Sequence, residues 1–190
     1  MGTCMAGKNL LRIVVLASAL ATAAQSPVAA QSARTKAVVR ADFPASATIE
    51  QKTFFFEEAE LQWIADASHA PVNSRLYTVF IARQDKRVIG YATVPTLSVR
   101  TKPATLLIRL SPRGAVQQVR ILTWLEAPRY RPDAAWLDQF RGASSDRLPY
   151  LGKDVQMGRS RRVGARTITQ AVRRCLVIYK LRLSGAGINP

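Results

Sequence analysis

The chain has 190 residues, 48% of them hydrophobic and 21% charged, a composition typical of a globular protein rather than a disordered tail. Its 28 Lys and Arg residues against 12 Asp and Glu residues give a formal charge of +16, so an anionic partner is expected: nucleic acid, a membrane surface or a phosphorylated ligand. Two cysteines and one histidine exclude a disulfide scaffold and a zinc site built mainly from these residue types.

The first thirty residues have the layout of a secretory signal peptide. Lys8 and Arg12 precede an apolar run over residues 13–24, which is shorter than the about 20 residues of a membrane-spanning helix, and small residues follow it. We therefore predict cleavage before Gln31 and an exported, periplasmic protein. Removal of residues 1–30 lowers the formal charge from +16 to +14 and leaves Cys175 as the only thiol.

The rest of the chain predicts one α+β domain, a small antiparallel sheet packed with helices. A linker over residues 31–41 leads into the domain over residues 42–183, and a flexible tail follows over residues 184–190. The pattern predicts helices over residues 54–67, 133–140 and 167–179, strand pairs over 76–81 with 88–94 and over 105–110 with 116–124, and a loop over 141–162.

Side chains suited to catalysis are few. His69 is the single histidine and is expected to be a solvated residue at a helix exit, while Cys175 lies on the apolar face of the last predicted helix as a packed thiol. The scattered acids Glu126, Asp133 and Asp138 are expected to be surface partners of arginines rather than a catalytic pair. The sequence therefore indicates a binding or carrier protein more than a stand-alone enzyme, with no metal site.

The basic residues concentrate near the C-terminus. After Asp154 there are eight Lys and Arg residues and no acidic residue. Within this stretch, residues 163–172 are interpreted as a small-residue turn followed by hydroxyls and a helix start, an arrangement that binds phosphate well. A plain helix cap with a solvated basic face is the alternative reading of the same residues.

At these residues the sequence resembles the FMN-binding domain family, which includes flavin-carrying subunits of sodium-pumping NADH:quinone reductase and of Rnf-type complexes, and small exported proteins. The family motif is Ser/Thr-Gly-Ala-Thr, then small or hydroxyl residues, then Ala-Val at a helix start. Gly164-Ala165, Thr169 and Ala171-Val172 stand at the matching spacing. The resemblance extends over most of residues 41–182 through Ala41-Asp42-Phe43-Pro44, Val88-Ile89-Gly90-Tyr91 and Glu126 with Gln139-Phe140-Arg141-Gly142.

One departure from the family motif changes the expected chemistry. In the family, the Thr after Gly-Ala carries FMN through a phosphoester bond, but Arg166 stands there and has no hydroxyl. Covalent attachment of FMN at that position is therefore excluded. Thr167, one residue further on, has a hydroxyl, but we do not expect it to carry the flavin, because a shift of one residue points its side chain in another direction. The resemblance then implies noncovalent FMN, with the phosphate end held by residues around the turn: Gly164, Ala165, Arg166, Thr167, Thr169, Arg161 and Arg162.

Two function classes follow from the resemblance. The first is an exported electron-transfer carrier that holds FMN noncovalently, with Trp124, Tyr130 or Trp136 beside the ring and a redox partner protein or membrane redox complex as its partner. The second is a flavin-free accessory protein whose basic surface binds an acidic protein or an anionic membrane surface. Nucleic-acid binding is a poor third, because the chain carries an export signal and no interleaved aromatic-basic motif.

Overall fold

The computed structural model describes residue 1, residues 27–157 and residues 162–185. Its helices are α1 (Pro27–Ala41), α2 (Glu58–Ser68), α3 (Ala134–Leu137) and α4 (Arg162–Arg182), with short 3-10 helices η1 (Pro128–Tyr130) and η2 (Asp138–Phe140). Its strands are β1 (Thr48–Phe55), β2 (Leu76–Gln84), β3 (Arg87–Thr93), β4 (Thr96–Ser98), β5 (Pro103–Leu110) and β6 (Val116–Trp124). The predicted mixture of helices with an antiparallel sheet is confirmed.

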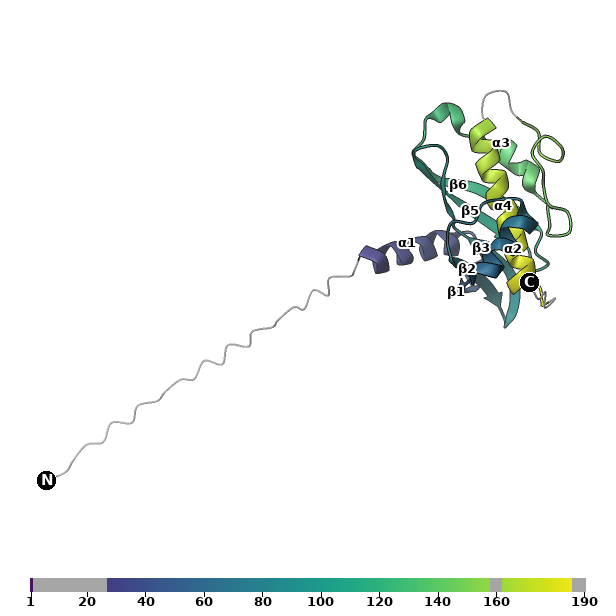
Figure 1. The fold of residues 1–190 in the computed structure, drawn as a ribbon. Helices are drawn as coiled ribbons and strands as arrows, with labels where there is room; N and C mark the ends of the chain where they lie inside the picture. The colour runs from purple at the N-terminus through teal and green to yellow at the C-terminus, as the bar shows by residue number, and fades with distance from the viewer. Residues whose placement is uncertain (2–26, 158–161, 186–190) are drawn as a thin grey trace.

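The six strands form one sheet, in which β1, β2, β3 and β5 follow one another and both β4 and β6 pair with β5 (Figure 1). Side chains alternate between the two faces of this sheet. Val79 and Ile81 of β2 face a core formed with α4, whereas Phe80 between them packs on the other face with Val39 of α1. The sheet is therefore covered by α4 on one side and by the end of α1 on the other.

The two predicted strand pairs are confirmed. The first hairpin turns at Asp85 and Lys86, whose φ angles of 47° and 67° are both positive, as a tight two-residue hairpin turn requires. The second hairpin turns at Gly114, with a φ of 78°. A Cβ at Gly114 would lie 2.0 Å from the Tyr179 ring, so the turn also makes room for an aromatic side chain of α4.

The N-terminal half differs from the prediction at one helix boundary and in the conformation of the segment before the domain. Phe54 and Phe55, assigned to a helix, end strand β1, which pairs with β2 along its whole length. The helix begins after Glu57, whose side chain and that of Glu60 form a reciprocal capping box. Residues 31–41, expected to be a linker, are helical and form most of α1, so the predicted cleavage point before Gln31 lies within a helix. The signal peptide itself lies largely outside the described residues, and export stays a prediction.

The C-terminal half follows the prediction more closely. The short helix predicted over residues 133–140 is present as α3 and η2, and Asp133 caps it by accepting a hydrogen bond from the Trp136 backbone N–H at 2.8 Å. The final helix, predicted from Thr167, begins at Arg162 and continues to Arg182. Among helices in the described ranges, none has both the length and the apolarity needed to cross a membrane.

Candidate functional site

A groove of about 710 Å³ lies along α4, at the place where the sheet splits. The pairing of β2 with β3 ends at Phe80 and Ala92, and the following strand β4 pairs with β5 instead of β2. One side-chain hydrogen bond, from Thr93 Oγ1 to the Thr78 carbonyl oxygen at 3.0 Å, marks the end of the ladder. The opening between the start of β2 and β4 is closed underneath by α4.

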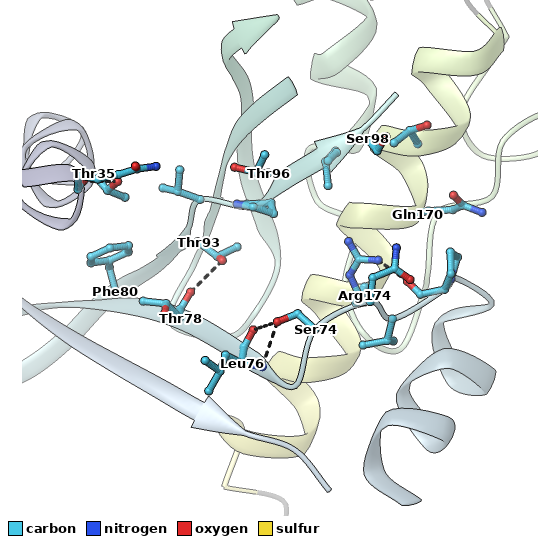
Figure 2. Close-up of a pocket in the computed structure, with 18 of the residues that line it drawn as sticks. Thr35, Ser74, Leu76, Thr78, Phe80, Thr93, Thr96, Ser98, Gln170 and Arg174 are labelled. Atoms are coloured by element: carbon cyan, nitrogen blue, oxygen red, sulfur yellow. Dashed lines mark hydrogen bonds between the residues drawn. The ribbon is translucent and has the colours of Figure 1, made fainter. Parts of the chain in front are cut away.

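Figure 2 shows how hydroxyl groups surround this groove, which we call the split-sheet groove. Arg174 is the one charged residue among the described residues that line it, and its Nη1 donates to the Pro71 carbonyl oxygen. Apolar side chains, among them Leu76, which is 60% exposed, contribute most of the remaining surface. Four amide side chains, of Gln31, Gln51, Asn73 and Gln170, complete the lining. The hydroxyl-bearing lining residues are Ser32, Thr35, Ser74, Thr78, Thr93, Thr96, Ser98 and Thr167, and the apolar ones are Pro71, Val72, Leu76, Phe80, Val94, Pro95 and Leu97.

A second pocket, of about 430 Å³, lies between α4 and the segment around Tyr150, and we call it the arginine pocket. Gln170 lines both pockets, so the two are neighbours on the surface of α4. The lining contains three arginines and, within the described part of the chain, no Asp or Glu. Its residues are Tyr150, Leu151, Met157, Arg162, Arg166, Thr169, Gln170 and Arg173.

Arg173 is the unusual residue of the arginine pocket. Its side chain is only 7% exposed, and its Nε and Nη2 atoms are buried without a hydrogen-bond partner. The guanidinium carbon lies 4.2 Å from the centroid of the Tyr150 ring, a cation–π contact. Burial lowers the pKa of Arg173, because loss of water disfavours the charged form. An unsatisfied buried donor lowers the stability of a protein by about 1–3 kcal/mol, so the two unpaired nitrogens of Arg173 call for an explanation.

The small-residue turn predicted within residues 163–172 is wrong, because residues 163–166 are already helical, in the first turns of α4. Gly164 is nonetheless explained by packing. A Cβ there would lie 2.1 Å from the Tyr130 carbonyl oxygen and 2.9 Å from the Trp124 ring. The glycine therefore lets α4 approach η1 closely, and Ala165 beside it is 1% exposed in the core.

The two threonines predicted to bind the cofactor, Thr167 and Thr169, donate their hydroxyl hydrogens to backbone carbonyl groups of α4. Thr167 Oγ1 donates to the Val163 carbonyl oxygen at 3.1 Å, and Thr169 Oγ1 donates to the Ala165 carbonyl oxygen at 2.8 Å. A hydroxyl has a single hydrogen, so in this conformation neither threonine can also donate to a phosphate. Each can still accept a hydrogen bond from a ligand.

The predicted cofactor-binding residues thus separate into groups. Arg162, Arg166 and Thr169 line the arginine pocket, whereas Thr167 lines the split-sheet groove. Gly164 and Ala165 line neither pocket, and Arg161 lies outside the described residues. The sequence interpretation missed Arg173 and Tyr150. The spacing of Arg162, Arg166 and Arg173 by four and then seven residues, which puts all three on one helix face, was the available signal.

The aromatic residues expected beside a flavin ring do not line either pocket. Trp136 packs against Phe140, with ring centroids 5.3 Å apart, and its Nε1 donates to the Gln156 carbonyl oxygen at 2.6 Å. Trp124 lies against Gly164, and Tyr130 makes cation–π contacts with arginines. These three residues have structural roles in the fold.

The remaining residues considered for chemistry behave largely as expected. His69 is the exposed C-cap of α2, with a φ of 44°. Cys175 is a buried free thiol, and burial raises its pKa to about 11. Asp138 forms an ion pair with Arg141 at 3.1 Å, whereas Glu126 accepts hydrogen bonds from backbone N–H groups, including that of Ala127 at 2.9 Å, which lower its pKa.

Within the described residues, no three His, Cys, Asp or Glu side chains gather as a metal site. Comparison with protein-family models and with curated proteins found no match to this chain.

Proposed function

We propose that this protein is an exported carrier that binds FMN noncovalently in the split-sheet groove and exchanges electrons with a redox partner protein. The observation that carries the proposal is the composition of the groove: one cation, many hydroxyls and a set of apolar side chains around a volume of about 710 Å³. These are the three kinds of group that a flat ring, a polyhydroxylated chain and one phosphate require. The family resemblance supplies the identity of the ligand.

The residues present fit each part of FMN. Val72, Leu76 and Val94 offer apolar surface to the ring. The hydroxyl oxygens of the groove offer acceptors to the ribityl chain, because most of these hydroxyls already donate their hydrogen within the fold. Arg174 offers a guanidinium to the phosphate. When bound, FMN supplies one- and two-electron redox chemistry. The chain's own part is to orient the ring and to shield one side of it from water.

The attachment is proposed to be noncovalent because the chain lacks a hydroxyl at the family position. Arg166 is exposed and cannot form a phosphoester. Thr167 lines the groove but is hydrogen-bonded to its own helix. We expect no flavin to remain on the polypeptide after denaturing electrophoresis of protein loaded with FMN. An in-gel flavin band that disappears in Thr167→Ala would overturn this part of the proposal.

The test is an equilibrium titration of FMN monitored by quenching of its fluorescence. We expect Arg174→Gln to weaken FMN binding about 10- to 100-fold, the range that loss of a charge-assisted hydrogen bond produces. The matched control is Arg113→Gln, which removes an exposed arginine from the turn between β5 and β6 and should leave the affinity unchanged. Absence of quenching at high micromolar FMN would contradict the proposal and favour the flavin-free accessory protein.

A further inference from the structure

The arginine pocket presents positive charge that no acidic side chain of its described lining balances. Arg162, Arg166 and Arg173 occur at positions i, i+4 and i+11 of α4, so they form a row along one face over roughly 16 Å of helix. Arg162 and Arg166 are exposed and keep their hydration, but Arg173 is 7% exposed. The cost of burying a cation among like charges therefore falls mainly on Arg173.

The contacts of Arg173 do not supply the missing partners. The Tyr150 ring covers one face of its guanidinium at 4.2 Å, which leaves the edge of the guanidinium, where its N–H groups lie, for hydrogen bonds. Nε and Nη2, the two nitrogens that form one side of the guanidinium fork, have no partner. A fork of this kind matches two oxygens of a phosphate or carboxylate.

We propose that the arginine pocket binds a phosphate group through the paired N–H donors of Arg173, with Arg162 and Arg166 neutralising its second charge. Gln170, at the border with the split-sheet groove, supplies a further amide donor. A tetrahedral dianion suits three cations better than a single carboxylate does, because its charge is larger and its oxygens point in several directions. This site does not depend on FMN binding in the groove.

The first experiment measures the melting temperature of the purified protein with inorganic phosphate against sodium chloride at matched ionic strength. We expect phosphate to raise Tm by about 5–10 °C at 100-fold excess over its Kd, the shift that binding to the folded state alone produces. A phosphate effect no larger than that of chloride would overturn the proposal.

The key variant is Arg173→Met, which keeps a flexible, unbranched apolar side chain at this position and removes the charge and the donors. We expect this variant to lose the phosphate response while its Tm in phosphate-free buffer is equal to or above that of the wild type, because the uncompensated buried cation is gone. Arg174→Met changes the adjacent residue, which lines the groove instead, and should retain the response. Retention of the phosphate response by Arg173→Met would refute the assignment.

A second variant keeps the test valid if Arg173→Met fails to fold. Arg166 is exposed on α4, so Arg166→Gln should fold normally and bind phosphate at least about threefold more weakly. An unchanged affinity in Arg166→Gln would contradict the proposed role of the row. Binding experiments that combine FMN with inorganic phosphate then show whether the ligand of the arginine pocket is the FMN phosphate or a separate phosphate group. Loss of FMN affinity in Arg173→Met, with Arg174 intact, identifies the FMN phosphate as the ligand of the arginine pocket and contradicts its placement at Arg174. Phosphate binding to the wild type that saturating FMN leaves unchanged identifies a separate phosphate ligand.

Discussion

The substitution Gly164→Ala tests whether Gly164 is needed for close packing of α4 or for binding of a ligand. In an open helix this change stabilises the protein by about 1 kcal/mol, because alanine has the higher helix propensity. Here the new Cβ would lie 2.1 Å from the Tyr130 carbonyl oxygen, a backbone atom that cannot rotate away. Either α4 or η1 would have to retreat by roughly 1 Å, and overpacking of this kind costs about 1–3 kcal/mol or more. We expect a net loss of about 2 kcal/mol.

The assay is urea denaturation followed by circular dichroism, with Arg166→Ala in the same turn as the matched control. Arg166 is exposed, so its replacement should change the free energy of unfolding by less than about 0.5 kcal/mol. FMN affinity should be unchanged in Gly164→Ala at temperatures where it is folded. A stability gain of about 1 kcal/mol would refute the close contact between α4 and η1, and a selective loss of FMN affinity would restore the phosphate-turn interpretation.

Two further predictions concern the core. Gly114→Ala should destabilise the protein by several kcal/mol more than Gly142→Ala. Both glycines have a positive φ, but only at Gly114 would the added Cβ lie 2.0 Å from an aromatic ring. Equal losses of stability in urea denaturation would show that backbone strain alone matters. In a Cys4→Ser background, Cys175 should resist a thiol reagent at pH 8, because it is buried and burial raises its pKa to about 11. It should react once urea unfolds the chain. Rapid labelling of the folded protein would contradict the placement of Cys175 in the core.

The elements that the sequence predicted well are those with a regular pattern and clear turn chemistry. The two hairpins combine β-branched runs with turns at Asp85-Lys86 and at Gly114, and both pairs are present. Strand β1 was missed because its residues are largely polar and exposed. It is held in the sheet by its pairing with β2 rather than by buried side chains of its own. A strand at the edge of a sheet gives a weak signal of this kind.

The start of α4 was misplaced because Gly164 has two readings in a sequence. Glycine near a helix start is typical of a turn that holds a phosphate, but it is also required where a helix packs closely on another segment. Only the position of the Tyr130 carbonyl oxygen distinguishes the two. The same limit applies to Arg173, which a sequence cannot distinguish from its solvated neighbours. The burial of its side chain depends on Tyr150, more than twenty residues away.

Part of the positive charge is neutralised by acidic side chains within the fold. Several arginines are engaged in ion pairs, among them Arg75 with Glu58 at 2.6 Å and Arg120 with Asp42 at 2.9 Å. The pair of Arg75 with Glu58 is exposed on both sides and contributes little to stability. Four cations of α4 differ because they line pockets, namely Arg162, Arg166, Arg173 and Arg174. Their expected ligands are individual phosphate groups rather than a polyanion.

Comparison of FMN with riboflavin in wild-type protein and in Arg174→Gln tests the proposed function most directly. The two ligands differ only by the phosphate, so a guanidinium that binds this group should make FMN bind about 10- to 100-fold more tightly than riboflavin in the wild type. In Arg174→Gln the two affinities should become nearly equal, because riboflavin binding is unaffected. Equal affinities in the wild type, or a preference for FMN that survives in Arg174→Gln, would contradict a flavin phosphate held by Arg174 in the split-sheet groove.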